Sequence, residues 1–397
     1  MIANHKINKI IFGCILNNKN INIDKKILPS LLDNLFKIFK FGRSESYLIN
    51  YIKLHSNISI PKSRKNIFRI LKNNANLRTL NSLKILESAT KIFYEFNKRK
   101  IRFIPLKGLQ FLYLYKINVS IRPIRDIDIL VDVNEIHKVI NALNSIGFFF
   151  DDRRLNTSFV LKNYSNFYDL PPMYNKERVC VEIHYKILNK ESCRFTQTLL
   201  GSNQYEMIGD LKIPKITPEH LMIHVIYHAT SKQGFDVGIQ AILDFLNIIR
   251  LSDVDIDKLI RISKDYDLFG EVSLFINLAN KYNYLDINEK PQNRYKKYSK
   301  DSLKNFEDLI LCNNITHSSF NLIRYGFKNL MKKNFSINIL KSNTFSQKKP
   351  LINIFNSCQH LFIQAYKLLY ILIKMTFVSS FRKNNIKAIN LLKEIKE

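Results

Sequence analysis

Apolar positions recur at helical spacing along much of the chain. In residues 77–98 they lie three and four residues apart, which predicts a helix with one face in a core. The predicted core stripe is Leu80, Leu83, Leu86, Ala89, Ile92 or Phe93, and Phe96. Residues 28–41 form a second amphipathic segment, and the rest of residues 1–76 reads as short helices between asparagine-rich turns. The N-terminal part is therefore expected to be helical.

The pattern changes between residues 101 and 185, where apolar and polar side chains alternate as they do in strands. Three strands are predicted, at residues 101–106, 127–131 and 178–185. In the third, Cys180, Glu182 and His184 share one face while the valine and isoleucine between them share the other.

Helices are predicted to connect and follow these strands. They cover residues 109–115 and 134–146, and Gly147 closes the second as a C-cap. Thr217, followed by proline and glutamate, is a typical helix start. Helices are expected to dominate from there to the end, and no internal repeat is visible.

Composition and charge narrow the class of protein. With 397 residues, 46% of them hydrophobic, and 28 Phe and 19 Tyr, the chain has the material for two or three folded domains and does not resemble a disordered protein. The formal net charge of +29 favours an anionic partner, which is a nucleic acid, a nucleotide or a membrane surface. An AT-rich genome would also enrich lysine, asparagine and isoleucine.

Cysteine use and hydropathy bear on the location of the protein. The five cysteines are scattered and include no CxxC pair, so we interpret them as reduced thiols of a cytoplasmic protein. No apolar run reaches the length of about 18 residues that a spanning helix needs. Residues 361–381 come nearest, but Lys367 and Lys374 interrupt them.

Two acids interrupt an apolar run in the segment IRPIRDIDILV. Asp126 and Asp128 point to the same face of the predicted strand, so their carboxylates repel one another. A bound cation is the commonest reason for such a pair, although Asp-x-Asp by itself also occurs in solvated edge strands and turns. Glu182 on the third strand is a further acid, and an ion pair with one of the many lysines is its alternative explanation.

Several short sequence motifs occur here in a recognisable order. They are Ile104-Pro-Leu-Lys-Gly108, Arg122-Pro-Ile-Arg-Asp-Ile-Asp-Ile-Leu-Val131, Val181-Glu-Ile-His184, His228 and Asp244. This series resembles the nucleotidyltransferase core of the DNA polymerase β superfamily and, more narrowly, its uncharacterised nucleotidyltransferase family. The resemblance covers about residues 78–250. It implies an α+β fold in which a small mixed-sheet polymerase β-like core has helical domains on its N- and C-terminal sides.

The resemblance also implies roles for individual residues. Asp126, Asp128 and Glu182 would be the catalytic metal ligands for two Mg²⁺ ions, with Mn²⁺ as an alternative. Lys107, Gly108 and Arg122 would bind the triphosphate, with Gly108 opening a helix whose N-terminus receives the phosphates. The superfamily usually has Gly-Ser at this turn, whereas the narrower family has Lys-Gly.

Other residues have two interpretations. Arg125 departs from the family pattern and is either an added phosphate clamp or a side chain in solvent. His184, His228 and Asp244 are candidate supporting residues of the active site, and a core position is the alternative for His184. His220, His224 and His228 share a helix face, which permits zinc binding, but they lack the glutamate of a metalloprotease.

Four regions are predicted: an N-terminal helical region (1–76), the nucleotidyltransferase core (77–215), a helical domain (216–290) and a basic, mainly helical C-terminal region (291–397). Between Asp308 and Glu394 the chain has thirteen lysines and arginines and no acid. Interleaved aromatic residues make this region a candidate nucleic-acid surface. Codon bias on an ordinary helical domain is an equal alternative, and residues 361–381 also suit a membrane surface.

The predicted function is Mg²⁺-dependent transfer of a nucleoside monophosphate from an NTP to an acceptor hydroxyl. The acceptor is left open among tRNA or another RNA, a protein and a small metabolite. The alternative is a catalytically decayed nucleotidyltransferase fold that serves as a nucleic-acid-binding module.

Overall fold

The computed structural model describes most of the first 311 residues. The described segments are residues 4–16, 19, 28–55, 58–151, 157–164, 170–188, 194–232, 238–284, 295–311, 391 and 394–395. They form two compact units: Met1–Tyr227 with Ile239–Lys297, and His228–Gly238 with Tyr298–Glu397. The predicted basic surface between residues 308 and 394, with its apolar segment 361–381, falls almost entirely outside the described residues.

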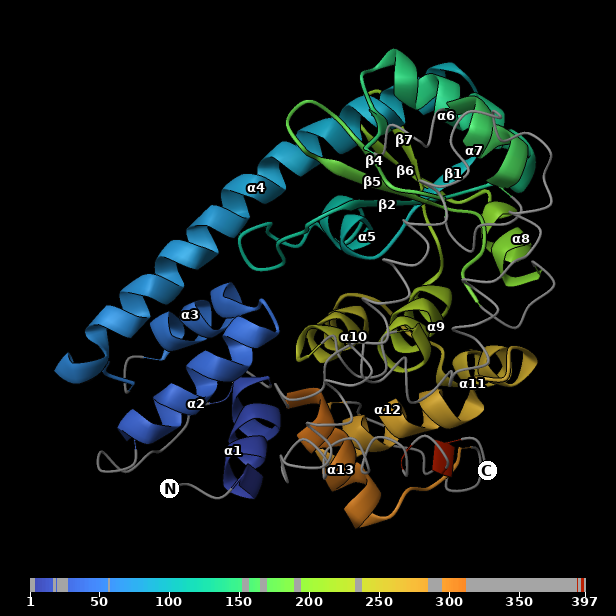
Figure 1. The fold of residues 1–397 in the computed structure, drawn as a ribbon. Coiled ribbons are helices and arrows are strands. Elements are labelled where there is room, and N and C mark those ends of the chain that lie inside the picture. The colour runs from blue at the N-terminus through green and yellow to red at the C-terminus, as the bar shows by residue number, and fades with distance from the viewer. Residues whose placement is uncertain are drawn as a thin grey trace, which may run out of the picture. The chain divides into compact units, whose positions relative to one another are not determined.

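The first unit contains a mixed five-stranded sheet, which confirms the predicted α+β class (Figure 1). Its order is β1-β2-β5-β4-β3, and β2 runs parallel to β5 while the other neighbours are antiparallel. The strands are β1 (Phe103–Pro105), β2 (Ile127–Val131), β3 (Phe149–Phe150), β4 (Met173–Tyr174) and β5 (Cys180–His184). The three predicted strands are β1, β2 and β5.

The remaining strands were not predicted. Strands β3 and β4 have two residues each, which is too short for alternation to show. The hairpin of β6 (Tyr205–Ile208) and β7 (Leu211–Pro214) was also missed, and β7 packs against β1 and helix α4 (Lys65–Lys98).

One face of the sheet is the main core of this unit. Ile127, Ile129 and Val131 of β2 are fully buried there with Val181 and Ile183 of β5. Helix α4 and α6 (Ile136–Ser145) pack over this face, and Gly147 ends α6 with a φ of +88°, as expected for the predicted C-cap. The opposite face is therefore the one on which the polar residues of β2 and β5 lie.

Helix α4 (Lys65–Lys98) has 34 residues, and its length corrects the sequence prediction. The prediction began this helix at residue 77 and divided residues 1–76 into short helices, but residues 65–76 continue α4 without a break. Asparagines have only a modest unfavourable helix propensity, and no Gly or Pro lies between Pro61 and Pro105 to stop the helix.

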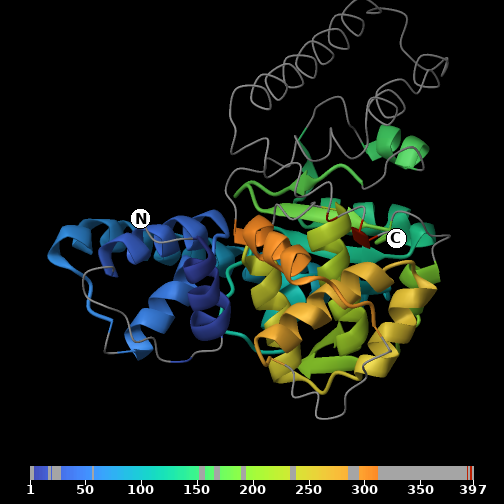
Figure 2. The same ribbon diagram turned by 90° about the horizontal axis from the view of Figure 1, so that it is seen from below.

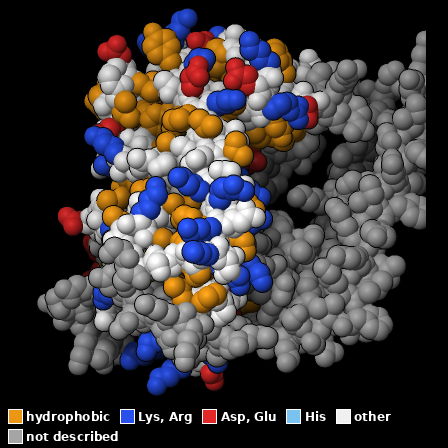
Figure 3. Space-filling view, turned by 90° about the vertical axis from the view of Figure 1, so that its left-hand side faces the viewer, with side chains coloured by type: hydrophobic (Ala, Val, Ile, Leu, Met, Phe, Trp, Pro, Cys, Tyr) orange, Lys and Arg blue, Asp and Glu red, His pale blue; other side chains and the backbone are white. Residues whose placement is uncertain are grey.

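The predicted core stripe on α4 is right only in its second half. Ala89, Ile92, Phe93 and Phe96 are buried, and Leu86 packs against the core. By contrast, Leu80 and Leu83 are 57% and 49% exposed. These leucines lie on the face of α4 that points away from the core, because their neighbours Ser82 and Ile85 are the buried residues of this turn. Figure 3 shows this side, where apolar side chains lie among lysines and arginines.

A group of N-terminal helices adjoins α4, and two of them, residues 28–41 and 45–54, pack against it. They are α1 (Asn4–Ile10), the π-helix η1 (Ile11–Ile15), α2 (Leu28–Phe41) and α3 (Glu45–Leu54), followed by the 3-10 turn η2 (Lys62–Arg64). The predicted helix 28–41 coincides with α2. Figure 2 shows these helices in blue, as a group beside the sheet.

A second helical group follows the sheet in sequence and is yellow in Figure 2. It consists of α9 (Pro218–Tyr227), α10 (Gln240–Leu251), α11 (Ile256–Asp265) and α12 (Phe269–Lys281), which contact one another. The shorter helices are α5 (Gly108–Tyr113), η3 (Val133–Glu135), α7 (Thr157–Asn163) and α8 (Arg194–Leu200), and the second unit contains η5 (His228–Lys232) and α13 (Lys300–Leu311). No helix of the described segments is both long and apolar enough to cross a membrane.

Candidate active site

Acidic side chains gather on the face of β2 and β5 that is opposite the apolar core. The parallel register places Asp128 directly across from Glu182, and Leu130 across from His184. Because residues two apart on a strand share a face, Asp128, Glu182 and His184 face the same side of the sheet. Asp126 immediately precedes β2 and is partly buried.

Asp128 is the centre of the contacts in this group. Its Oδ1 atom lies 2.6 Å from Lys107 Nζ and 2.8 Å from His184 Nε2. The same imidazole nitrogen lies 3.8 Å from Glu182 Oε2. Asp128 is only 2% exposed, whereas the Glu182 side chain is 40% exposed. The group thus has a buried end at Asp128 and an open end at Glu182.

Burial and charge move the ionisation of these groups in opposite directions. Burial, and then the neighbouring Asp128 carboxylate, raises the pKa of Asp126 to about 6. Burial alone would also raise the pKa of Asp128, but the Lys107 ammonium and His184 hold it well below its usual range. In turn, the surrounding carboxylates raise the pKa of Lys107 against the effect of its burial. Asp128 and Lys107 are therefore a charged pair, and the carboxylate of Asp126 is negative charge in excess of that pair.

The turn before α5 directs Lys107 towards Asp128. Lys107 has a φ of +49°, a left-handed conformation that residues other than glycine rarely adopt, and strain of this kind costs about 1–3 kcal/mol. The backbone N–H of Leu106, just before it, donates to the carbonyl of Asp128 at 2.9 Å. The turn is thus held against β2 at the residue that Lys107 contacts.

Gly108 has a packing reason to be glycine. A Cβ atom at this position would lie 2.4 Å from Ile124 Cγ2, so a side chain would push away the segment that leads into β2. The prediction that a helix N-terminus receives phosphates here is weakened, because α5 has only six residues.

Arg122 forms a bidentate ion pair with Asp244 of α10. Its Nε and Nη2 atoms lie 2.7 Å and 2.9 Å from the two carboxylate oxygens, and Nη1 donates to the Pro123 carbonyl at 2.7 Å. The two side chains are only 13% and 9% exposed. Both residues were predicted for the site, but their pairing was not, since 122 positions separate them.

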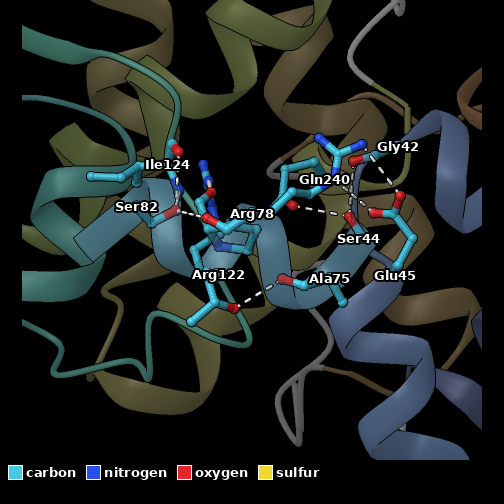
Figure 4. Close-up of polar contacts among 11 residues, drawn as sticks. Gly42, Ser44, Glu45, Ala75, Arg78, Ser82, Arg122, Ile124 and Gln240 are labelled. Carbon is cyan, nitrogen blue, oxygen red and sulfur yellow. Dashed lines mark hydrogen bonds and ion pairs between the residues drawn. The ribbon is translucent and has the colours of Figure 1, made fainter. Parts of the chain in front are cut away.

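A polar network continues from this pair to the N-terminal helices. Gln240 Nε2 donates to Asp244 at 2.8 Å, and the Ser44 hydroxyl lies 2.9 Å from Gln240 Oε1. Figure 4 shows Ser44 between Gly42 and Gln240, with Arg78 of α4 facing the buried Glu45. This network joins α3, α4 and α10.

The same network anchors the segment that leads into β2. The Ser82 hydroxyl of α4 accepts from the backbone N–H of Ile124 at 2.9 Å and lies 3.1 Å from its carbonyl (Figure 4). Arg122 and Ile124 are thus both tied to helices, and the backbone just before Asp126 is held on two sides.

The other predicted residues lie apart from this group. Arg125 is exposed, and its charge lowers the pKa of Asp126 against the larger effect of burial. His228 begins η5 in the second unit, so its supporting role stays a prediction. His220 contacts Thr217 Oγ1 through Nδ1 at 2.9 Å.

The donor set fits a divalent metal ion. Metal ligands in proteins are mainly His, Cys, Asp and Glu. Within the described segments, one group of three or more such side chains has all its ligand atoms within 4.8 Å of one another, and it consists of Asp128, Glu182 and His184. Two carboxylates and an imidazole are ordinary ligands of divalent ions. Asp126 is not part of this group, although the charges of Asp128 and Glu182 act on it. The zinc alternative on the histidine face of α9 gains no support from the described residues.

Comparison with known proteins agrees with this arrangement. Residues 34–283, more than half of the chain, match the model of a family described as uncharacterised nucleotidyltransferase. The match includes β1, β2 and β5 with all the acids of the site, and also α10 with Asp244. A search of the curated proteins finds no match.

Proposed function

The chain belongs to the uncharacterised nucleotidyltransferase family, and we propose that it transfers a nucleoside monophosphate from an NTP to an acceptor hydroxyl with the help of divalent metal ions. One observation carries the metal dependence. Asp128 and Glu182 lie together with His184, and the charge of Asp126 acts with theirs on the Lys107 ammonium, in a protein whose net charge is +29. A purely structural role would not need three acids around one lysine.

The acids would hold the metal ions, with Mg²⁺ as the first choice and Mn²⁺ as the alternative. When bound, such ions stabilise the negative charge of the attacking and leaving oxygens in phosphoryl chemistry. Asp128 is already ionised and oriented by its two contacts, and Asp126, whose pKa is about 6, is mostly ionised at neutral pH and would keep its charge beside a bound cation. The Glu182 side chain is 40% exposed, and its carboxylate would accept the proton of an acceptor hydroxyl.

The cations around the acids would hold the triphosphate. Lys107 carries its ammonium into the site on a strained turn, and a phosphate oxygen can replace Asp128 as its partner once a metal neutralises that carboxylate. Arg125 is exposed and adjacent to Asp126. Arg122 is fixed by Asp244, so it can donate to a phosphate only through the N–H groups that this pair leaves over.

The acceptor remains open in this proposal. RNA, including tRNA, a protein hydroxyl and a small metabolite are all compatible with a half-exposed Glu182. The net charge favours an acceptor that carries negative charge.

Transfer of label tests the proposal. Purified protein would be incubated with Mg²⁺ or Mn²⁺ and each α-labelled NTP, and with the RNA, protein and small-molecule fractions of a bacterial lysate as acceptors. The expected result is label in one fraction, and none with the Asp126→Asn, Asp128→Asn double variant. Asp151→Asn is the matched control, because Asp151 is an exposed carboxylate paired with Arg178.

The opposite outcome has a clear meaning. If no fraction takes up label, and wild type and double variant bind RNA equally well, the protein is a nucleic-acid-binding module on a decayed nucleotidyltransferase fold.

A further inference from the structure

His184 is more deeply buried in the site than Glu182. Its side chain is 4% exposed, and it is one rung further along β5 than Glu182 on the same face. The Nε2 atom faces both carboxylates, at 2.8 Å from Asp128 Oδ1 and 3.8 Å from Glu182 Oε2. The imidazole therefore occupies the buried corner of the acid group.

These distances suit a shared metal ion. In an octahedral site with bonds of about 2.1 Å, neighbouring donor atoms are about 3 Å apart. The Asp128–His184 distance already has this value, and the longer distance to Glu182 closes with a small movement of a side chain that is 40% exposed. Apart from the Lys107 ammonium that contacts Asp128, no side chain of the group has to leave its place for the three donors to bind one ion.

We propose that His184 is itself a metal ligand, and that Asp128, Glu182 and His184 bind a divalent transition-metal ion in preference to Mg²⁺. This inference rests on the proposed function, because it concerns the metal of the same site. The reason is the nitrogen donor. Imidazole is a good ligand for first-row transition metals, whereas Mg²⁺ prefers oxygen ligands and gives up its water reluctantly.

Lys107 competes with a metal ion for Asp128. Its ammonium contacts the same Asp128 oxygen that His184 contacts, so an incoming ion has to displace it. A transition metal that gains an imidazole nitrogen displaces this ammonium more readily than Mg²⁺ does, which widens the difference between the two ions.

Mn²⁺ binding to the full-length protein tests the inference without an activity assay. The affinity for Mn²⁺ would be measured from the loss of its free electron paramagnetic resonance signal, and the affinity for Mg²⁺ by competition. Pulsed measurements on bound Mn²⁺ would then report any directly coordinated nitrogen. We expect nitrogen coupling in the wild type and tighter binding of Mn²⁺ than of Mg²⁺ by at least about tenfold.

The His184→Gln variant gives the second readout. It should lose the nitrogen coupling and bind Mn²⁺ at least about tenfold more weakly, while the Mg²⁺ affinity changes less. His137→Gln is the matched control, because His137 is exposed on α6, and it should behave as the wild type. The wild-type spectrum stands even if His184→Gln fails to fold.

Two other outcomes separate this inference from the proposed function. If Mn²⁺ binds without nitrogen coupling and His184→Gln weakens both ions equally, His184 only orients Asp128 by a hydrogen bond. The inference is then wrong while metal-dependent transfer stands. If the wild type binds neither ion, with or without an NTP, both proposals are wrong.

Discussion

Two ion-paired regions lie beside the turn at Lys107 and Gly108, and they differ in charge balance. In the first, which we call the acid cluster, Asp126, Asp128 and Glu182 surround the single buried ammonium of Lys107. In the second, which we call the clamp, one guanidinium meets one carboxylate in the bidentate pair of Arg122 and Asp244.

The difference separates a structural contact from a binding site. The clamp is neutral as a pair, it is well aligned, and it ties the segment before β2 to α10. The acid cluster has more carboxylates than the one ammonium of Lys107 balances, and burial, followed by the charge of Asp128, raises the pKa of Asp126 to about 6. Functional sites commonly keep such unfavourable charge, because the ligand that relieves it is bound only in function. The following predictions test this contrast, from the largest effect to the smallest.

Removing the charge of Asp244 should have the largest effect on folding. Asp244→Asn leaves the Arg122 guanidinium at low exposure without its carboxylate, so we expect a loss of about 3 kcal/mol in the free energy of unfolding. Chemical denaturation would measure it. Asp151→Asn breaks a bidentate pair with Arg178 that is exposed, and it should change the stability little. Equal effects of the two variants would show that the clamp is not a special contact.

Removing the excess negative charge of the acid cluster should increase the free energy of unfolding. The pKa of Asp126 is raised from 3.8 to about 6 by folding, so its carboxylate destabilises the metal-free fold above pH 6, by roughly 3 kcal/mol at most. Asp126→Asn should therefore stabilise the protein at pH 7.5 in the presence of a chelator. The gain should shrink between pH 6 and pH 4, where Asp126 becomes protonated.

Thermal unfolding across this pH range, with and without metal, would measure the effect. Addition of Mg²⁺ or Mn²⁺ should stabilise the wild type more than Asp126→Asn. A variant that is less stable than the wild type at pH 7.5 without metal would contradict the charge imbalance.

A methyl group at Gly108 should disturb both regions at once. In Gly108→Ala the new Cβ meets Ile124 Cγ2 at 2.4 Å, so the segment between Arg122 and Asp126 has to move. We expect a loss of about 1–3 kcal/mol in stability and weaker NTP binding, measured by denaturation and by calorimetric titration. Gly13→Ala is the control, since its nearest neighbour would be Tyr282 at an ordinary 3.9 Å. Unchanged NTP binding in Gly108→Ala would separate this turn from the nucleotide site.

The smallest effect is expected at the far end of the clamp network. Ser44→Ala removes the hydroxyl that lies 2.9 Å from both Gly42 O and Gln240 Oε1, and should cost about 1 kcal/mol of stability. Metal affinity should not change, because the acid cluster does not include this contact. Ser63→Ala, at an exposed position, is the control. A change in metal affinity with Ser44→Ala would show that the clamp and the acid cluster are energetically coupled.

Much of the fold near the site could be predicted from local patterns. The strand at residues 127–131 coincides with β2, and the helix start at Thr217 precedes α9 directly. Alternation along residues 178–185 correctly placed Val181 and Ile183 on the buried face. The two-residue strands and the first half of α4 were missed, because they depend on partners outside the local window.

The predicted site had a similar limit. The order of the short motifs was enough to indicate the acids, the turn and the family, because each word is local and has a characteristic composition. The roles of these residues in metal and phosphate binding stay predictions. Triphosphate binding by Arg122 is among them, and what the sequence did not predict is that its guanidinium pairs with Asp244.

The sequence by itself determined which segments are strands and helices around the site, and which side chains can carry its chemistry. It did so because alternation, helical spacing and turn residues act between neighbours along the chain. Only the tertiary structure decided which of these side chains contact one another. Lys107 faces Asp128 across 21 positions, His184 across 56, and Arg122 meets Asp244 across 122. The packing of β2 between β1 and β5, and of α10 beside them, selects these partners from the many lysines, arginines and acids that composition alone makes available.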